Sequence, residues 1–291
     1  MTTLVSAWKA ARTRLEAAGV EGPVIDARLL VEAASGASRL DIITDPQRLL
    51  TSDQELTLEA LLVRREKREP ISHILGVRGF WKIMLKVTPD VLTPRPDTES
   101  LLDVVLPRIP ADRAVTVLDL GVGSGAILLA ILAERPAARG LGVDVSAEAV
   151  AVARDNAANL GLGSRVALLR GDWTAGLASE SFDVVVANPP YIPSGDIEGL
   201  APEVRDHEPR LALDGGIDGL DAYRAIAPEI MRVLRPGGVF AVEIGLGQAP
   251  AVQALFREAQ AVDVAVHNDL TARPRIVAGM KKALGEQPPT R

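Results

Sequence analysis

The sequence predicts an α/β protein with a doubly wound, largely parallel β-sheet in residues 115–280. Three observations support this fold class. Short runs of β-branched and aliphatic residues alternate with helical segments, which is typical of a parallel sheet. The first run ends in a glycine-rich loop, and the fourth ends in a polar corner built on two prolines. Open α/β sheets bind their ligands at such carboxyl ends of strands.

Composition restricts the class of protein further. The chain has 291 residues, a formal net charge of −6 and no cysteine, so neither disulfides nor thiolate metal sites can form. The acidic balance disfavours tight, nonspecific binding to duplex nucleic acid, which requires a basic face. The three histidines lack metal-ligand spacing, so no metal site is expected. There is no recognisable signal peptide or membrane-spanning run, which together with the lack of cysteine favours the cytoplasm.

Residues 1–75 are expected to form a small N-terminal helical domain that recognises the substrate. Apolar residues recur there at helical spacing, and Asp26 is placed to cap a second helix. A longer helix, capped by Thr51 or Ser52, ends in a basic run at residues 64–69. We interpret this run as a solvated helix end, and contact with RNA or an acidic partner is the alternative.

Residues 76–96 are expected to form a β-hairpin and linker, because glycines separate two short apolar runs. Two prolines then stiffen the loop before residue 97. Asp97 or Thr98 is placed to cap the helix that follows. The catalytic domain is expected to occupy residues 97–291.

Seven strands and three further helices are expected in the catalytic domain. The strands are short apolar runs bounded by glycine, proline or polar residues, and the last two are expected to form an antiparallel edge. A long polar loop occupies residues 192–217. The expected strands are 115–120, 140–144, 166–170, 182–187, 239–244, 262–267 and 275–280, and the helices are 126–133, 147–160 and 221–234.

The fourth strand ends in the corner Asn188-Pro189-Pro190-Tyr191, and these four residues are the catalytic candidates. Two successive prolines end the strand and hold the backbone stiff. The Asn188 side-chain carbonyl and the Pro189 backbone carbonyl can both accept hydrogen bonds, which suits a planar –NH2 group. Tyr191 offers a ring face for a flat group. A plain strand-ending turn is the alternative, and the upstream glycine-rich loop favours the functional interpretation.

The loop after the first strand reads Asp119-Leu120-Gly121-Val122-Gly123-Ser124-Gly125. Its glycines allow the backbone to turn sharply and to approach a ligand. The spacing is not the Gly-x-Gly-x-x-Gly of dinucleotide sites, and Asp119 would repel a pyrophosphate. An acidic glycine loop instead suits a cofactor with an amino-acid end and a sulfonium cation, which is S-adenosylmethionine. The expected contacts are Asp119, Gly121, Val122, Gly123, Ser124 and Gly125.

Three more residues are candidates for binding this cofactor. Asp144 ends the second strand, where it can accept hydrogen bonds from ribose hydroxyls. It could instead cap the next helix, but Ser146 can fill that role. Asp172 and Trp173 follow the third strand, where Asp172 can accept from the adenine amino group and Trp173 can lie along the ring. Burial as an ordinary core residue is the alternative for Trp173.

These residues resemble the release-factor glutamine methyltransferases, the HemK/PrmC family of class I methyltransferases. The resemblance runs nearly end to end. The proline-rich loop and the Glu-Pro…Gly-Gly segment distinguish this family, since Asn-Pro-Pro-Tyr also occurs in adenine-N6 methyltransferases. The matching segments are Gly76 with Phe80-Trp81, Pro94-Arg95-Pro96-Asp97-Thr98-Glu99, Leu118 to Gly121 with Gly123-Ser124-Gly125, Gly171-Asp172-Trp173, Asn188 to Tyr191, Glu208-Pro209-Arg210, Gly215 to Leu220, and Asn268-Asp269-Leu270.

The resemblance implies a Rossmann-like, seven-stranded class I methyltransferase domain, preceded by the small helical domain and the β-hairpin linker. It implies methyl transfer from S-adenosylmethionine to the side-chain amide nitrogen (N5) of the glutamine in the Gly-Gly-Gln loop of class 1 peptide chain release factors, and so a role in translation termination. By position, residues 121–125, Asp144, Trp173 and Asn188 would touch the cofactor. Residues 188–191 would hold the glutamine.

An amide nitrogen is a poor nucleophile because its lone pair is delocalised. The hypothesis is that the Asn188 and Pro189 carbonyls take the amide hydrogens and aim the nitrogen at the methyl group. The alternatives are a ribosomal-protein glutamine, adenine N6 in nucleic acid, or a non-catalytic binding module. We expect a monomer whose partner is the release factor, with no stable nucleic-acid or membrane partner.

Overall fold

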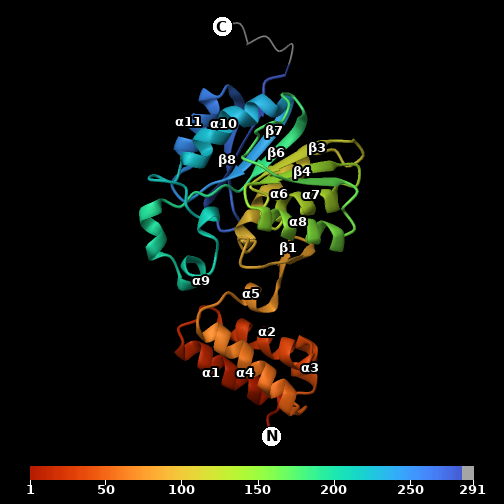
Figure 1. Ribbon diagram of the computed structural model, residues 1–291, viewed down its shortest axis with the longest axis vertical. Coiled ribbons are helices and arrows are strands. Elements are labelled where there is room, and N and C mark those ends of the chain that lie inside the picture. Colours follow the sequence, from red (N-terminus) through yellow and green to blue (C-terminus); the bar gives the residue numbers. More distant parts are fainter. Residues whose placement is uncertain (284–291) are drawn as a thin grey trace. The chain divides into compact units, whose positions relative to one another are not determined.

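The computed structural model describes residues 1–283, and the chain forms two compact units (Figure 1). The first unit consists of Met1–Val77 together with Ala201–His207, and the second begins with Arg78–Leu200 and resumes at Glu208. The first unit is therefore discontinuous in sequence. A short piece of the long loop after the Asn-Pro-Pro-Tyr corner packs with the N-terminal helices, which the sequence did not predict.

The first unit is helical. Its helices pack around one apolar cluster that includes Leu4, Leu15, Leu30 and Leu62, and α1, α2 and α4 lie side by side (Figure 1). Thr51 caps α4, as predicted, through a capping box. The helices are α1 (Leu4–Ala17), α2 (Pro23–Ser35), α3 (Arg39–Thr44), α4 (Ser52–Glu66), α5 (Ile71–Leu75) and α9 (Pro202–Arg205).

Asp26 does not cap a helix, so that prediction is wrong. Helix α2 begins at Pro23, three residues before Asp26, because proline suits the first turn and Gly22 provides the left-handed backbone before it. Asp26 lies inside α2 with 7% of its surface exposed. Its Oδ2 accepts a hydrogen bond from Arg65 Nε at 2.8 Å.

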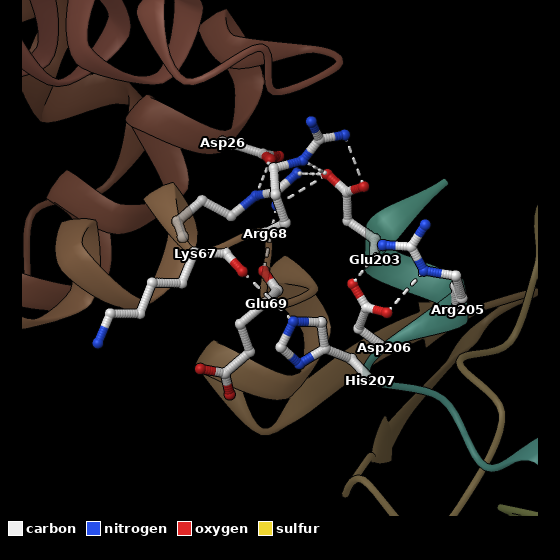
Figure 2. A network of polar contacts seen from close by, with 9 residues as sticks. Asp26, Lys67, Arg68, Glu69, Glu203, Arg205, Asp206 and His207 are labelled. Atoms are coloured by element: carbon white, nitrogen blue, oxygen red, sulfur yellow. Dashed lines mark hydrogen bonds and ion pairs between the residues drawn. The ribbon is translucent and has the colours of Figure 1, made fainter. Parts of the chain in front are cut away.

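The basic run that ends α4 is not simply solvated, contrary to our interpretation. Arg65 is only 4% exposed, and its Nη2 lies 3.0 Å from Glu203 Oε1. Arg68 donates from Nε to Glu203 Oε1 at 2.6 Å and from Nη2 to Oε2 at 2.7 Å. Figure 2 shows Asp26, Arg68 and Glu203 converging, while the Lys67 side chain extends away from them. The acidic partner of this run is thus a residue of the same chain.

The second unit contains a two-stranded hairpin and a seven-stranded sheet, which confirms the predicted fold class. The sheet order is β5-β4-β3-β6-β7-β9-β8; the first five strands are parallel, and β9 is antiparallel to both of its neighbours. The hairpin strands are β1 (Val77–Phe80) and β2 (Ile83–Lys86). The sheet strands are β3 (Thr116–Leu120), β4 (Arg139–Asp144), β5 (Val166–Arg170), β6 (Phe182–Ala187), β7 (Leu234–Glu243), β8 (Ala261–Asn268) and β9 (Pro274–Lys281).

Helices cover both faces of this sheet (Figure 1). One apolar cluster lies between the sheet and α6, α7 and α8, and a second lies between the sheet and α10 and α11. The hairpin residues Phe80 and Leu85 belong to the first cluster. The helices are α6 (Glu99–Val105), α7 (Ala126–Glu134), α8 (Ala147–Asn159), α10 (Asp221–Val233) and α11 (Ala249–Glu258), with 3₁₀ turns at Pro96–Thr98, Leu106–Arg108, Ser194–Gly199 and Arg210–Ala212.

Around the sheet, the structure departs from the predicted elements in three places. Neither Asp97 nor Thr98 caps α6 through its side chain, so that prediction is wrong, and Asp97 Oδ2 instead accepts a hydrogen bond from Arg275 Nη2 at 2.7 Å. Strand β7 starts at Leu234, before Pro236 and the two glycines that we took as a break. A register shift accommodates these residues, because Phe182 pairs with Leu234 while Val184 pairs with Val239. Helix α11, which covers the edge of the sheet, was not predicted at all.

Candidate active site

The site lies where the sheet reverses its winding direction. Strand β3 has β4 on one side and β6 on the other, and Leu120 pairs with both Val143 and Ala187. The loops after these three strands therefore leave the same sheet edge together. They border a cavity of about 290 Å³. Its lining includes Gly121, Val122, Gly123, Ser124, Asp144, Asn188 and Pro190 from the predicted site, with Pro89 to Leu92, Pro94, Arg95, Thr98, Ala126, Ile127, Ser146, Glu148, Ala149, Pro209, Leu211 and Ala212.

The glycine-rich loop turns on left-handed backbone at Gly121, Gly123 and Gly125, with φ of 72°, 53° and 85°. Gly125 does not line the cavity but forms the N-cap of α7. A Cβ there would lie 2.8 Å from Leu129 Cδ1, so this glycine lets the helix pack closely. Gly123 N donates to Asp144 Oδ2 at 2.9 Å, which joins the loop to the end of β4.

Asp144 lines the cavity, and its second oxygen, Oδ1, accepts from Ser146 N at 3.0 Å. Ser146 in turn caps α8, so Asp144 is not needed for that role. Two more acidic residues line the cavity, Asp90 and Glu148, against a single basic residue, Arg95. This acidic lining fits a sulfonium cation and opposes a pyrophosphate.

Asp119 lies at the end of β3, beneath the loop, and does not line the cavity. It is 1% exposed; its Oδ2 accepts from Leu128 N at 3.2 Å. Within residues 1–283, Asp119 Oδ1 has no hydrogen-bond partner. Burial raises the pKa of Asp119 to about 8, against the opposing effect of the Leu128 amide. A direct contact between Asp119 and the cofactor remains a prediction.

Asp172 and Trp173 follow β5 and do not line the cavity. Trp173 has a positive φ of 46° and packs against the apolar cluster beneath α10. Its ring lies beside the glycine loop, since a Cβ at Gly121 would lie 3.8 Å from Trp173 Cζ3. Adenine recognition by these two residues remains a prediction.

The residues of the corner after β6 lie in two different environments. Asn188 and Pro190 line the cavity, whereas Pro189 is buried. Asn188 Nδ2 donates to Thr98 Oγ1 at 3.3 Å. The Tyr191 hydroxyl donates to Glu243 Oε1 at 3.2 Å, and burial and this carboxyl raise the pKa of Tyr191. Tyr191 also lines a second cavity, with residues 245–248 among others.

The segment from Gly215 to Leu220, which is part of the family resemblance, packs against the backbone of the corner at Tyr191. A Cβ at Gly215 would lie 2.8 Å from Tyr191 Cα, and one at Gly219 would lie 2.3 Å from Tyr191 O. Gln248 Nε2 donates to the carbonyls of Tyr191 and Gly219 at 2.9 and 3.1 Å. Only glycine permits this close approach of the two backbones, so the segment fixes the corner's position.

Sequence reasoning assigned no binding role to several residues of the cavity. Arg95 and Thr98 come from the proline-rich loop, and Pro209 to Ala212 follow Glu208. Arg95 Nη2 donates to Glu208 Oε2 at 2.8 Å, which ties these two segments together. Burial raises the pKa of Glu208, and Arg95 opposes that rise. The sequence signal that could have pointed to these residues is the high density of prolines and charged residues in both loops.

In the described part of the chain, no cluster of three or more His, Cys, Asp or Glu side chains could hold a metal ion. Among residues 1–283, no helix is both long enough and apolar enough to cross a membrane.

Comparison with known proteins gives consistent results along the whole chain. Residues 6–76 match the model of the PrmC N-terminal domain, and residues 111–281 match that of a methyltransferase domain. A release factor glutamine methyltransferase of Caulobacter vibrioides is 61% identical over 97% of this chain and 98% of its own. One of Rhodospirillum rubrum is 46% identical over 95% and 84%. A crystal structure of a methyltransferase from Pyrococcus furiosus has a TM-score of 0.50 at 16% identity, over 77% of this chain and 98% of that one.

The sheet, the acidic glycine loop and the matched domain define an S-adenosylmethionine-dependent methyltransferase. Asp144 and the loop residues Gly121 to Ser124 line the cavity described above, and their contact with the cofactor remains a prediction. With near-complete coverage of its curated relatives, the chain belongs to the release factor glutamine methyltransferase family.

Proposed function

We propose that this protein methylates the N5 amide nitrogen of the glutamine in the Gly-Gly-Gln loop of class 1 peptide chain release factors. The observation that carries the proposal is the position of Asn188. It lies on the wall of the cavity that Asp144 and the glycine loop border, at the end of a strand stopped by two prolines. Its similarity to two bacterial release factor glutamine methyltransferases supports the choice of a release factor.

In this proposal the corner acts by orientation. Asn188 Oδ1 and the Pro189 carbonyl accept the two amide hydrogens of the glutamine, which fixes the plane of the amide and the direction of its nitrogen. The bound cofactor supplies an electrophilic methyl group. Because both acceptors are held before substrate arrives, they also favour the positive charge that develops on nitrogen. The hydrogen bond from the Tyr191 hydroxyl to Glu243 Oε1 holds the end of the corner in place.

The oligomeric state, the cellular location and the role of the helical unit are also proposals. We infer that the enzyme acts as a monomer in the cytoplasm, binds no nucleic acid stably, and grips the release factor with its helical unit. The net charge of −6 supports the absence of a stable nucleic-acid partner, and the lack of cysteine fits a reducing cytoplasm. The match of residues 6–76 to the PrmC N-terminal domain supports a role for that unit in this family.

Adenine N6 in nucleic acid is also a planar amino group, so the corner alone does not exclude it. The acidic balance and the family membership favour the protein substrate. A ribosomal-protein glutamine is the nearer rival, because it presents the same chemical group.

Mass spectrometry tests the proposal directly. Purified enzyme and S-adenosylmethionine are incubated with a class 1 release factor, with ribosomal proteins and with DNA in parallel. We expect one added methyl group on the glutamine of the Gly-Gly-Gln peptide, and none on a release factor in which that glutamine is replaced by alanine. Methylation of DNA or of a ribosomal protein, with the release factor unmodified, would refute it.

A further inference from the structure

The charges on the wall of the cofactor cavity suit most of the cofactor but oppose one of its groups. S-adenosylmethionine carries two cationic groups, the sulfonium and the amino group, and one carboxylate. Asp90, Asp144 and Glu148 line the cavity and attract the two cations. They repel the carboxylate, and an unpaired charge is costly to remove from water. The carboxylate therefore needs a cation or free hydrogen-bond donors on the cavity wall.

The glycine-rich loop has few donors to give. Four of the five backbone amides in residues 121–125 already donate to oxygen atoms of the protein. These are the amides of Gly121, Val122, Gly123 and Gly125, with distances of 2.8 to 3.0 Å. A phosphate-binding loop differs in that its amides point at the anion and are free to bind it. The glycine loop of this protein is therefore not a ready-made site for the carboxylate.

Among the residues of 1–283 that line the cavity, Arg95 alone has a basic side chain. This side chain is 41% exposed, and its Nη2 donates to Glu208 Oε2 at 2.8 Å. The Glu208 side chain is only 1% exposed, so a buried carboxylate holds the guanidinium at the wall. A guanidinium has five N–H donors, and this hydrogen bond uses one of them. Arg95 therefore has donors for a second anion.

The helical unit of the same chain shows that one arginine can pair with two carboxylates. Arg65 Nε donates to Asp26 Oδ2 at 2.8 Å, while its Nη1 and Nη2 both donate to Glu203 Oε1 at 3.0 Å. The donors of the planar guanidinium point in different directions, so the two carboxylates do not compete for the same hydrogen atoms. The pairing of Arg95 with Glu208 is thus compatible with a further carboxylate.

We propose that Arg95 binds the carboxylate group of S-adenosylmethionine. The guanidinium receives the one anionic group of the cofactor, while the acidic lining faces the two cationic groups. This division of charge favours a single orientation of the amino-acid end. The first turn of α7 is the competing anion site, because Ala126 and Ile127 line the cavity at a helix N-terminus. The inference concerns cofactor binding and holds for any substrate that receives the methyl group.

Decarboxylated S-adenosylmethionine is the probe for this site, because it keeps the sulfonium and the amino group and lacks only the carboxylate. Calorimetry measures the Kd of both ligands for the wild type, Arg95→Gln and Arg95→Lys. The acidic lining by itself favours the decarboxylated ligand, which carries one more net positive charge. A preference for S-adenosylmethionine therefore reports a local cation. We expect the wild type to bind S-adenosylmethionine at least about 10-fold more tightly than the probe.

The variants should change the two binding constants differently. In R95Q we expect the Kd for S-adenosylmethionine to rise about 10- to 100-fold and that for the probe to rise less than about 3-fold. R95K keeps the charge without the planar fork and should retain part of the preference. The matched control is Arg235→Gln, because the Arg235 side chain is 45% exposed and also pairs with a carboxylate, that of Asp183. It should leave both Kd values unchanged.

Four results would overturn the inference. The first is a wild type that binds both ligands equally. The second is an unchanged preference in R95Q, which would assign the carboxylate to the start of α7. The third is an equal weakening of both ligands in R95Q, which would make Arg95 a support of the cavity wall only. If R95Q binds neither ligand, R95K decides, and the fourth is then a loss of the preference or of all binding in R95K.

Discussion

Arg68 and Glu203 form a bidentate ion pair within the helical unit, although 135 positions of sequence separate them. The Glu203 carboxylate also accepts from the buried Arg65, so one side chain receives hydrogen bonds from two guanidinium groups (Figure 2). Burial alone would raise the pKa of Glu203, but the hydrogen bonds from Arg68 and Arg65 lower it below its usual value of 4.5. The segment Ala201–His207 is held in the first unit chiefly by this arrangement.

Replacing Glu203 by Gln should loosen that segment. The variant removes the carboxylate that Arg65 and Arg68 share, and we expect a loss of about 1–3 kcal/mol of stability in the helical unit. Hydrogen exchange over α4 and α9, with urea unfolding, measures the loss. The matched control is Glu16→Gln, in an exposed pair with Arg12, which should cost less than about 0.5 kcal/mol. Equal, small effects of both variants would contradict the prediction.

Replacing Asn188 by Ala should abolish most turnover and leave the cofactor bound. The variant removes one of the two proposed acceptors, so we expect kcat to fall at least about 100-fold. Calorimetry should show a Kd for S-adenosylmethionine within about 3-fold of wild type. Asn159→Ala, at an exposed position of α8, serves as the control and should retain full activity. A near-normal rate in N188A would exclude the orientation mechanism.

Replacing Asp144 by Ala should weaken cofactor binding. The variant removes an anion from the cavity wall and frees Gly123 N from the contact at 2.9 Å that joins the loop to β4. We expect the Kd for S-adenosylmethionine to rise about 10- to 100-fold. Asp155→Ala provides a control, because Asp155 is exposed and pairs with the exposed Lys86. An unchanged Kd in D144A would remove Asp144 from the cofactor site.

The stability of the cofactor-free protein should depend on pH through Asp119. Its pKa is raised from 3.8 to about 8 in the folded state, so the folded protein binds the extra proton between these values. Within this pH window the free energy of unfolding is therefore greatest at low pH, and it falls as the pH rises by at most about 1.4 kcal/mol per pH unit. Because Asp119→Asn lacks the titrating group, its free energy of unfolding should fall less over the same window.

Urea midpoints at pH 5.5 and pH 7.5 provide the measurement for Asp119. Between pH 5.5 and pH 7.5 the urea midpoint of the wild type should fall more than that of D119N. Parallel behaviour of the two proteins over this interval would show that the carboxyl is ionised in the fold.

Much of the sheet could be predicted from sequence because its central strands, such as β3 and β6, are buried on both faces and read as continuous apolar runs. Strands β5 and β6 have the predicted bounds, Val166–Arg170 and Phe182–Ala187. Strand β7 was predicted too short, since its first half contains residues that normally end strands. Only pairing with Phe182 across a register shift keeps that half in the sheet, and such pairing is not visible in local sequence.

Those parts of the site that lie in a single local motif could be predicted from the sequence. The glycine loop, Asp144 and Asn188 each follow a strand, and parallel strands bring their ends together. Arg95 was not predictable in the same way, because its contact with Glu208 joins residues 113 positions apart. Local signals favoured Thr98 as a helix cap, whereas in the structure it lines the cavity.

The discontinuity of the helical unit limits how this enzyme can be divided. A fragment of residues 1–77 alone would lack Glu203 and would leave the Arg65 guanidinium buried with Asp26 as its remaining carboxylate partner. Cleavage of the backbone near residue 78 should not free the helices, since α9 would still anchor them through side chains alone. Exchange of this unit between related enzymes would accordingly require the short α9 segment to travel with it.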